Sequence, residues 1–211
     1  ALSPDGSTLV TASFDYSAVV WGTQTLDEQA TLLGHEAAVN TAAFSADGSL
    51  LATAGDDGSV LLWTKEQIGN DSAEPFVLQG HKGKVVDLAF SLDGTMLASA
   101  SWDGSIGIWP LAGTDLDKSQ SARFITGHEG PVNAVQFSDN NEYLYSAGYD
   151  GQIRYWRLQN NEYLRSPVRN GWGVSVFMVD EKADLVAYGG SDGQSVDEIR
   201  EAAKAYFATQ N

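Results

Sequence analysis

A 30-residue segment occurs three times in this chain, at residues 34–63, 80–109 and 127–156. Each copy begins with Gly-His and ends with a Trp that lies 28 residues after the His. The register does not slip, because a Phe also lies 9 residues after the His in all three copies. A period of roughly 20 to 50 residues is typical of architectures in which equivalent units stack on one another. This repetition restricts the possible folds more than any other feature of the sequence.

Two further stretches match the repeated unit in part. Residues 1–21 correspond to its second half, up to and including the closing Trp. A weak copy is expected at about 171–193, where Asn170-Gly171-Trp172-Gly173 stands near the place of the Gly-His. We therefore expect repeat units over 1–193, at about 1–33, 34–79, 80–126 and 127–165, followed by a degenerate unit at 166–193.

Each complete unit contains four short apolar runs separated by turn residues. In the copy that begins at Gly34, three runs cover 39–44, 50–54 and 60–63, and Asp-Gly dipeptides stand in the two gaps between them. Asp-Gly between such runs is a strong signal for a tight turn that joins two strands. A fourth run precedes each Gly-His and the degenerate unit, at 30–33, 76–79, 123–126 and 162–165. The sequence therefore predicts one four-stranded antiparallel sheet for each unit.

A lone sheet of this kind cannot bury both of its faces, so neighbouring sheets must stack on one another. Radial stacking also protects the strand edges. The sequence therefore predicts an all-β fold, a β-propeller with four-stranded antiparallel blades. At roughly 44 residues per blade, the chain supplies about 4 to 5 blades. We expect an incomplete ring, either an open arc or a ring that is completed by further residues or by another chain.

The segment 194–211 departs from the strand pattern. Ser195-Val196-Asp197-Glu198 has the form of a helix capping box. Val196, Ile199 and Ala203 then recur at helical spacing. The sequence therefore predicts a short amphipathic helix at 194–211, which packs either on the propeller or on a partner.

The order of Gly-His, strand, Asp-Gly turn, strand, Asp-Gly turn and closing Trp resembles the WD-repeat (WD40) β-propeller family. The resemblance covers residues 1–193 and is most specific in the three central units. It implies a hydrogen-bonded tetrad of the loop His, a Ser or Thr, the turn Asp and the Trp. The residues at these positions are His35, Thr53, Asp57 and Trp63; His81, Ser99, Asp103 and Trp109; His128, Ser146, Asp150 and Trp156; and Thr11, Asp15 and Trp21 in the first unit.

The tetrad has a physical purpose, because a buried imidazole and a buried indole N–H each need a hydrogen-bond partner. The degenerate unit departs from this pattern. Tyr188 and Glu198 occupy its positions four residues before and six residues after the turn aspartate Asp192. We therefore expect no tetrad in the fifth unit.

The residue content argues against catalysis. The chain has 3 His, and His35, His81 and His128 all occupy the Gly-His position, so none is left as a general base or metal ligand. The three turn aspartates likewise recur at one structural position and do not form a catalytic pair. With 0 Cys, a disulfide, a thiolate zinc site, a Cys nucleophile and a covalently attached haem are excluded. We therefore expect no enzymatic activity, no cofactor and no metal.

The charge of the chain indicates which partners fit. It carries 12 Lys and Arg against 28 Asp and Glu, for a net charge of -16. This charge repels phosphate backbones and anionic lipids, so neither a nucleic acid nor a membrane is expected as a partner. A basic protein partner fits the charge, and a solvated negative shell that only confers solubility fits it equally.

The residues directly before the turn aspartates depart from the preference of turns for polar side chains. Three of the four are large aromatics: the set is Phe14, Asp56, Trp102 and Tyr149. The resemblance implies that this position faces a common ligand-binding surface, together with the residue after the first strand valine, here Asn40, Val86 and Asn133. Aromatic side chains among polar groups suit a protein-interaction hot spot. The alternative is that each ring only covers its own turn.

These observations predict a non-catalytic WD-repeat scaffold that mediates protein–protein interaction through the rim face of the propeller. A second class stays open, because the fifth unit, with its Gly-Trp-Gly and 187–190, also resembles that of bacterial WD-repeat proteins with a c-type cytochrome domain. That alternative implies a periplasmic electron-transfer protein with its redox group outside this chain. A propeller hydrolase is a third class, disfavoured by the histidine count. The compartment stays unassigned: it is periplasmic under the cytochrome alternative and cytoplasmic otherwise.

Overall fold

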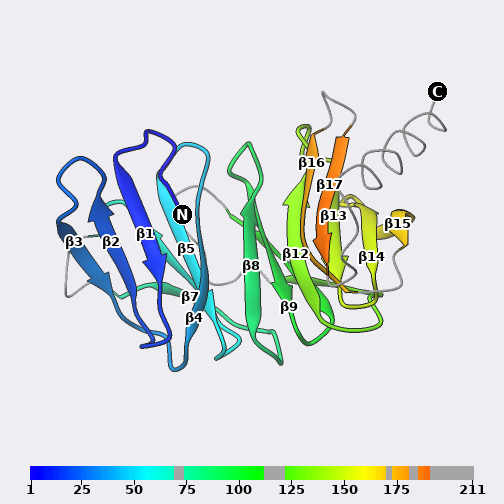
Figure 1. The fold of residues 1–211 in the computed structure, drawn as a ribbon, viewed down its shortest axis with the longest axis horizontal. Coiled ribbons are helices and arrows are strands. Elements are labelled where there is room, and N and C mark those ends of the chain that lie inside the picture. The colour runs from blue at the N-terminus through cyan, green and yellow to red at the C-terminus, as the bar shows by residue number, and fades with distance from the viewer. Residues whose placement is uncertain (69–73, 112–121, 170–172, 181–184, 191–211) are drawn as a thin grey trace.

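The computed structural model describes residues 1–68, 74–111, 122–169, 173–180 and 185–190. Every helix or strand element within these residues is a β-strand (Figure 1). The strands are β1 (Thr8–Ala12), β2 (Ala18–Gly22), β3 (Glu28–Leu32), β4 (Val39–Phe44), β5 (Leu50–Gly55), β6 (Val60–Thr64), β7 (Phe76–Leu78), β8 (Val85–Phe90), β9 (Met96–Ser101), β10 (Ser105–Pro110), β11 (Arg123–Thr126), β12 (Val132–Phe137), β13 (Tyr143–Gly148), β14 (Gln152–Arg157), β15 (Glu162–Arg169), β16 (Val174–Asp180) and β17 (Leu185–Gly190).

The strands form five antiparallel sheets in chain order. The three central sheets, β4 to β7, β8 to β11 and β12 to β15, have four strands each, as the sequence predicts. The first sheet consists of β1, β2 and β3, and the fifth of β16 and β17 within the described residues. In every sheet, each strand pairs with the strand that follows it in the chain. The prediction of an all-β fold built from four-stranded antiparallel sheets is thus confirmed.

The sheets follow one another across the molecule, from β1 to β3 on one side to β12 to β15 on the other, and β16 and β17 lie beside β12 and β13 (Figure 1). The first strands of successive sheets touch, since β4 contacts β8, β8 contacts β12 and β12 contacts β16. In the described part of the chain, the first and fifth sheets share no strand pairing, so no closed ring is formed there.

The hydrophobic core lies in layers between neighbouring sheets. Each layer combines residues of two sheets: Val20 with Leu61, Leu62 with Leu97, Ile108 with Leu144, and Ile153 with Val174 are examples. The central sheets are covered on both faces, and therefore β5 and the stretch Val60–Trp63 of β6 are buried at every position. The hydrophobic core is therefore divided into separate layers, each between two stacked sheets.

The turns between strands are held by Asp side chains and by glycines in the left-handed region. In the turn after β9, Asp103 accepts the backbone N–H of Ser105 at 2.8 Å, and Gly104 has a φ of 85°. A side chain at that φ would be strained, which explains the Asp-Gly pairs of the repeat.

The segment for which a helix is predicted, 194–211, lies outside the described residues, as does Asp192 of the degenerate unit. In the part of the chain that the structure covers, no helix has the length and apolarity needed to span a membrane.

Candidate functional site

In the third sheet, one hydrogen-bonded chain links four side chains. The Asp103 carboxylate only accepts, so His81 Nδ1 carries the proton and donates to Asp103 Oδ2 at 3.2 Å. His81 Nε2 then accepts from the Ser99 hydroxyl at 2.7 Å. The Ser99 oxygen in turn accepts the indole N–H of Trp109 at 2.8 Å. All three hydrogen bonds therefore have the same donor-to-acceptor direction: Trp109 donates to Ser99, Ser99 to His81, and His81 to Asp103.

The second and fourth sheets repeat this arrangement. His35 Nδ1 lies 2.9 Å from Asp57 Oδ2 and its Nε2 lies 3.0 Å from Thr53 Oγ1, which accepts the Trp63 N–H at 3.3 Å. In the fourth sheet, the corresponding distances are 2.9 Å for His128 to Asp150, 2.7 Å for His128 to Ser146 and 2.8 Å for Trp156 to Ser146. The structure therefore brings these predicted residues together.

The first sheet holds a reduced version of the network. Trp21 Nε1 donates to Thr11 Oγ1 at 2.9 Å, and Asp15 accepts the hydroxyl of Ser17 at 2.6 Å. Thr11 is exposed here, whereas its counterpart Ser99 in the third sheet is 0% exposed. Burial of the Ser or Thr thus depends on the elements packed around it.

Burial favours the neutral form of His81 and of His128. Burial lowers the pKa of His81 and of His128, and the neighbouring aspartates only partly offset this effect. Burial alone would raise the pKa of Asp103, but the hydrogen bonds from Ser105 and from the Lys82 backbone lower it to below its usual value. Each ring nitrogen is therefore engaged in a fixed hydrogen bond and serves to tie two loops together. Among the described residues, no group of three or more His, Asp or Glu is placed to hold a metal ion.

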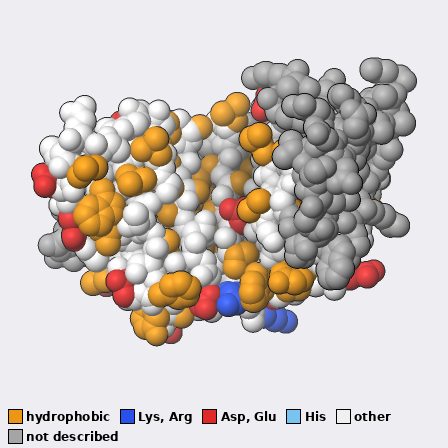
Figure 2. Space-filling view, in the orientation of Figure 1, with side chains coloured by type: hydrophobic (Ala, Val, Ile, Leu, Met, Phe, Trp, Pro, Cys, Tyr) orange, Lys and Arg blue, Asp and Glu red, His pale blue; other side chains and the backbone are white. Residues whose placement is uncertain are grey.

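The aromatic residues before the turn aspartates point outward. Phe14 is 85% exposed, Trp102 44% and Tyr149 61%. These residues belong to the turns that follow β1, β9 and β13, which lie along the lower edge of the molecule as drawn (Figure 1). We call the edge formed by the turns after β1, β5, β9 and β13 the rim. Hydrophobic side chains are visible along this edge, with Lys or Arg side chains beside them (Figure 2).

Several rim side chains contact one another across neighbouring sheets. The rings of Trp102 and Tyr149 meet edge to face, with their centroids 6.4 Å apart. Lys84 Nζ lies 4.3 Å above the centroid of the Trp102 ring and 3.5 Å from Asp56 Oδ2. Asn40 Nδ2 donates to Asp56 Oδ1 at 2.8 Å. The structure thus joins Asn40, Asp56, Trp102 and Tyr149 in one continuous row.

Beside this row lies a depression of about 550 Å³ between the third, fourth and fifth sheets. Four of the residues predicted to bind a partner contribute to its wall, namely Val86, Trp102, Asn133 and Tyr149. Its lining is Val86, Asp87, Trp102, Asn133, Ala134, Tyr149, Ser175, Val176 and Phe177, and we call it the rim depression. Asn133 is also a structural residue, because its Nδ2 donates to the backbone oxygen of Val174 at 2.8 Å. Phe14, Asn40 and Asp56 do not line this depression.

Sequence reasoning missed two charged residues at this place. Lys84 precedes β8 and reaches Trp102 only because the turn after β9 folds back beside it. Asp87 lies within β8, and its carboxylate accepts the backbone N–H of Val135, 48 residues further along the chain, at 2.9 Å. The available signal for Asp87 was its residue type, because Asp is unfavourable within strands and is seldom placed in an interior without a partner.

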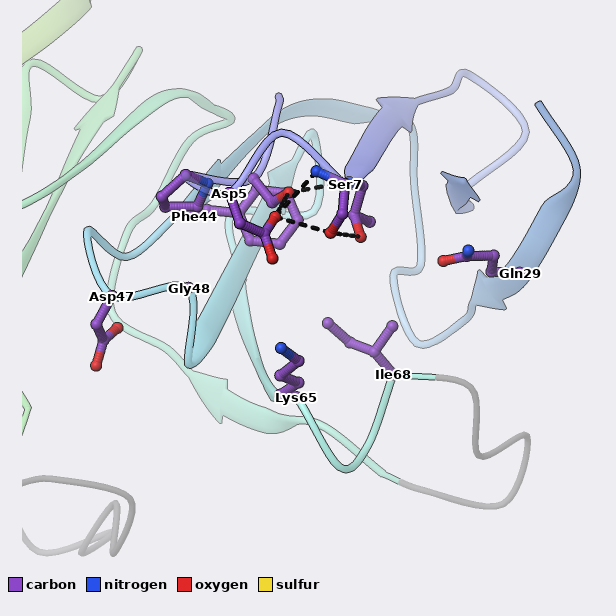
Figure 3. A pocket seen from close by; sticks show the side chains of 11 residues that line it. Asp5, Ser7, Gln29, Phe44, Asp47, Gly48, Lys65 and Ile68 are labelled. Carbon is purple, nitrogen blue, oxygen red and sulfur yellow. Dashed lines mark hydrogen bonds between the residues drawn. The ribbon is translucent and has the colours of Figure 1, made fainter. Parts of the chain in front are cut away.

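A second depression, of about 480 Å³, lies between the first and second sheets, away from the rim. Figure 3 shows Lys65 and Ile68 pointing into it and Asp47 turned away, while Asp5 accepts hydrogen bonds from Ser7. A similar crevice of about 570 Å³ recurs between the third and fourth sheets, lined by the corresponding turns. Because the crevice recurs at equivalent sheet junctions, we interpret it as a consequence of stacking and not as a specific site.

The comparisons with known proteins agree with this geometry. The sequence model of the WD40 family, described as WD domain, G-beta repeat, matches residues 1–22, 26–64, 73–110 and 119–157. A comparison with curated proteins gave no match. WD40 repeats generally serve as non-catalytic scaffolds that bind protein partners. Since the matches cover more than half of the chain and coincide with the stacked sheets and their tetrads, the chain belongs to the WD40 family of G-beta repeats.

Proposed function

We propose that this chain is a non-catalytic scaffold that binds a basic protein partner through its rim. The observation that carries the proposal is the exposed pair of Trp102 and Tyr149 beside the rim depression. Trp and Tyr are the residues most often found at the energetic centre of protein interfaces. A depression next to two such rings offers a partner both a pocket and an apolar wall.

The exposure of these rings argues against a role in covering their own turns. A ring that packs on its turn loses most of its accessible surface, yet Phe14 keeps 85% and Tyr149 keeps 61%. Exposed apolar surface of this kind in a folded protein is a feature of interaction sites. Trp102 is less exposed, at 44%, because Lys84 and Tyr149 lie against it.

The row of contacts around Trp102 favours a preorganised surface. Lys84 stands between Trp102 and Asp56, so one cation restrains an aromatic ring and a carboxylate of two neighbouring sheets. Asn40 donates to the other oxygen of the same carboxylate and also to the Val85 backbone oxygen, at 3.0 Å. Side chains that are already ordered lose less conformational entropy when a partner binds.

The charge of the chain supports a basic partner. A net charge of -16 attracts a positive surface and raises the rate of encounter. Salt screens such attraction over a distance of about 8–10 Å under physiological conditions. Capture of the partner should therefore weaken as the salt concentration rises.

The test is capture of partner proteins from native extract by immobilised wild type and by the double variant Trp102→Ala with Tyr149→Ala. Loss of an interface anchor typically costs about 2 kcal/mol or more, which corresponds to about thirtyfold in affinity. We expect the double variant to lose the captured proteins while its melting temperature stays within a few degrees of wild type.

The matched control is Leu26→Ala with Leu92→Ala. These two leucines are 73% and 65% exposed, and they lie in turns at the ends of the strands opposite to the rim. The control removes a similar kind of exposed apolar surface and should leave capture unchanged. Equal capture by wild type and the rim variant, or a collapse in the melting temperature of the rim variant, would refute a binding role for these rings.

A further inference from the structure

A carboxylate that forms no ion pair with any described residue lines the rim depression. Asp87 is partly buried in β8, and its Oδ2 accepts the Val135 backbone N–H at 2.9 Å. The side chain forms part of the same lining as Trp102 and Tyr149. Within the described residues, no Lys, Arg or His forms an ion pair with Asp87. The Asp87 carboxylate therefore lines the depression with the backbone N–H groups of Val135 and Leu88 as its hydrogen-bond donors.

The repeated sheets show that the fold does not require a carboxylate here. Asp87 pairs with Ala100 across the strand pair β8 and β9. At the same register in the neighbouring sheets, Thr41 pairs with Ala54 and Ala134 pairs with Ala147. A small polar residue and an apolar residue thus serve the same structural position, so the charge of Asp87 is a particular feature of the third sheet.

A buried charge at this place opposes folding. Burial raises the pKa of Asp87 to about 6, so at neutral pH the group is mostly ionised at an energetic disadvantage. Destabilising polar groups in a well-packed protein are concentrated at functional sites, where a ligand supplies the missing interaction. The missing interaction for a carboxylate is a positive charge.

We infer that the rim depression receives a positively charged side chain, lysine or arginine, from the protein partner, with its charge at Asp87 and its stem against Trp102 and Tyr149. This inference rests on the proposed function and names the chemistry of the partner. The depression of about 550 Å³ lies within the range of roughly 300 to 1,000 Å³ found for ligand sites. The side chains of lysine and arginine have an apolar stem and a charged head, which match the rings and the carboxylate.

The surroundings of Trp102 already show that its ring accepts a cation. Lys84 Nζ lies 4.3 Å from the ring centroid on the side that also faces Asp56. An aromatic face attracts an ammonium or guanidinium group by its quadrupole, and a nearby carboxylate adds a charge-assisted hydrogen bond. No lysine or arginine is part of the described lining of the rim depression, and Lys84 contacts Trp102 from outside that lining.

The experiment uses four blocked pentapeptides, Gly-Ala-X-Ala-Gly, in which X is arginine, lysine, citrulline or norleucine. They are titrated into the ¹⁵N-labelled chain, and the signal of the Trp102 indole N–H, assigned with Trp102→Phe, is followed by NMR. We expect saturable shifts with arginine or lysine and none with the two neutral residues. Asp87→Asn should weaken binding of the cationic peptide at least about tenfold.

Asp27→Asn is the matched control, because Asp27 is an exposed aspartate in the turn between β2 and β3 and its replacement makes the same change in charge. It should bind the cationic peptide as wild type does. Asn at position 87 keeps an oxygen that accepts the Val135 N–H. If that variant folds poorly, Asp87→Thr repeats the measurement with the residue that the second sheet has at this register. No saturable shift with either cationic peptide, or equal affinity of the position-87 variant and wild type, would overturn the inference.

Capture of the natural partner separates this inference from the proposed function. If Asp87→Asn captures the partner as wild type does, while Trp102→Ala with Tyr149→Ala loses it, the inference fails and the rim remains the binding surface. If the rim double variant retains full capture, the proposed function fails, and the peptide titration still decides whether the depression binds a cation.

Discussion

Asp103 and Asp87 lie in the same sheet, but their surroundings are opposite in character. Asp103 accepts hydrogen bonds from His81, from the backbone N–H of Lys82 and from Ser105. These partners lower its pKa in spite of burial. Asp87 accepts hydrogen bonds from the backbone N–H groups of Val135 and Leu88, and burial raises its pKa in spite of them. The folded state therefore favours the ionised form of Asp103 and disfavours the ionised form of Asp87.

The two aspartates therefore need different explanations, because the surroundings of Asp103 recur in other sheets and those of Asp87 do not. The environment of Asp103 recurs around Asp57 and Asp150, each with a His and a Ser or Thr behind it. A position whose contacts are reproduced in several sheets is explained by the fold itself. The position of Asp87 is filled by other residue types in the neighbouring sheets, so its charge needs a separate explanation.

The strongest contrast is expected from the turn aspartate of the fourth sheet. Asp150 accepts from His128, from the backbone N–H of Glu129 and from Arg154 Nη2 at 3.2 Å, and Arg154 is 8% exposed. Asp150→Ala leaves the Arg154 charge buried without its partner, a change that typically costs about 3–5 kcal/mol. Urea unfolding should show this loss of free energy, with Asp27→Ala as the control. A loss under about 1 kcal/mol would contradict the assignment of Asp150 to the stabilising network.

A smaller contrast lies within a single turn, between Trp102 and Asp103. Asp103→Ala removes a carboxylate from a buried hydrogen-bonded network and should cost about 1–3 kcal/mol. Trp102→Ala removes an outward-facing ring and should change the free energy of unfolding by about 0.5 kcal/mol or less. Thermal or urea unfolding of the two variants side by side measures the difference. Equal stability of the two variants would contradict the view that Asp103 stabilises the fold and Trp102 does not.

The sequence alone was sufficient to predict the sheets, because each strand and turn is specified by local residues. The spacing of Gly-His, Asp-Gly and Trp marks the three central sheets at the places where the structure has them. What it could not predict is burial, which depends on neighbours. Leu9 in β1 is 37% exposed, while its counterpart Leu97 in β9 is 0% exposed because the second and fourth sheets cover the third from both sides.

The candidate site was only partly accessible to sequence reasoning. Trp102 and Tyr149 were identified because an aromatic residue at a turn tip is unusual whatever surrounds it. Asp87 was missed because it lines a depression only when β12 and β16 fold beside it. These strands are distant in the chain and form the other walls of the rim depression. Lys84 was missed for the same reason, since its contact with Trp102 is set by folding of one loop against another.

The smallest expected effect has the opposite sign, because Asp87→Asn should stabilise the chain. Its pKa is about 6 in the folded state and 3.8 when unperturbed, so the folded state binds the proton more tightly. This group therefore opposes folding above pH 6, and the opposition disappears as the pH falls below about 4. Asn keeps the acceptor for the Val135 N–H without the charge. We expect a gain of about 1–2 kcal/mol at pH 8 that declines to zero near pH 4.

Measuring this difference between two proteins removes the titrations that they share. His81 and His128 have lowered pKa values, so the unfolded chain takes up their protons first, and both proteins lose stability as the pH falls below 6.5. Urea unfolding of wild type and Asp87→Asn at pH 8, 6 and 4 isolates the contribution of Asp87. A constant difference across this range would show that the carboxylate is not held at an energetic disadvantage. A stability difference that becomes smaller as the pH falls would show that the charge of Asp87 destabilises the folded state, whereas the carboxylate of Asp103 stabilises it.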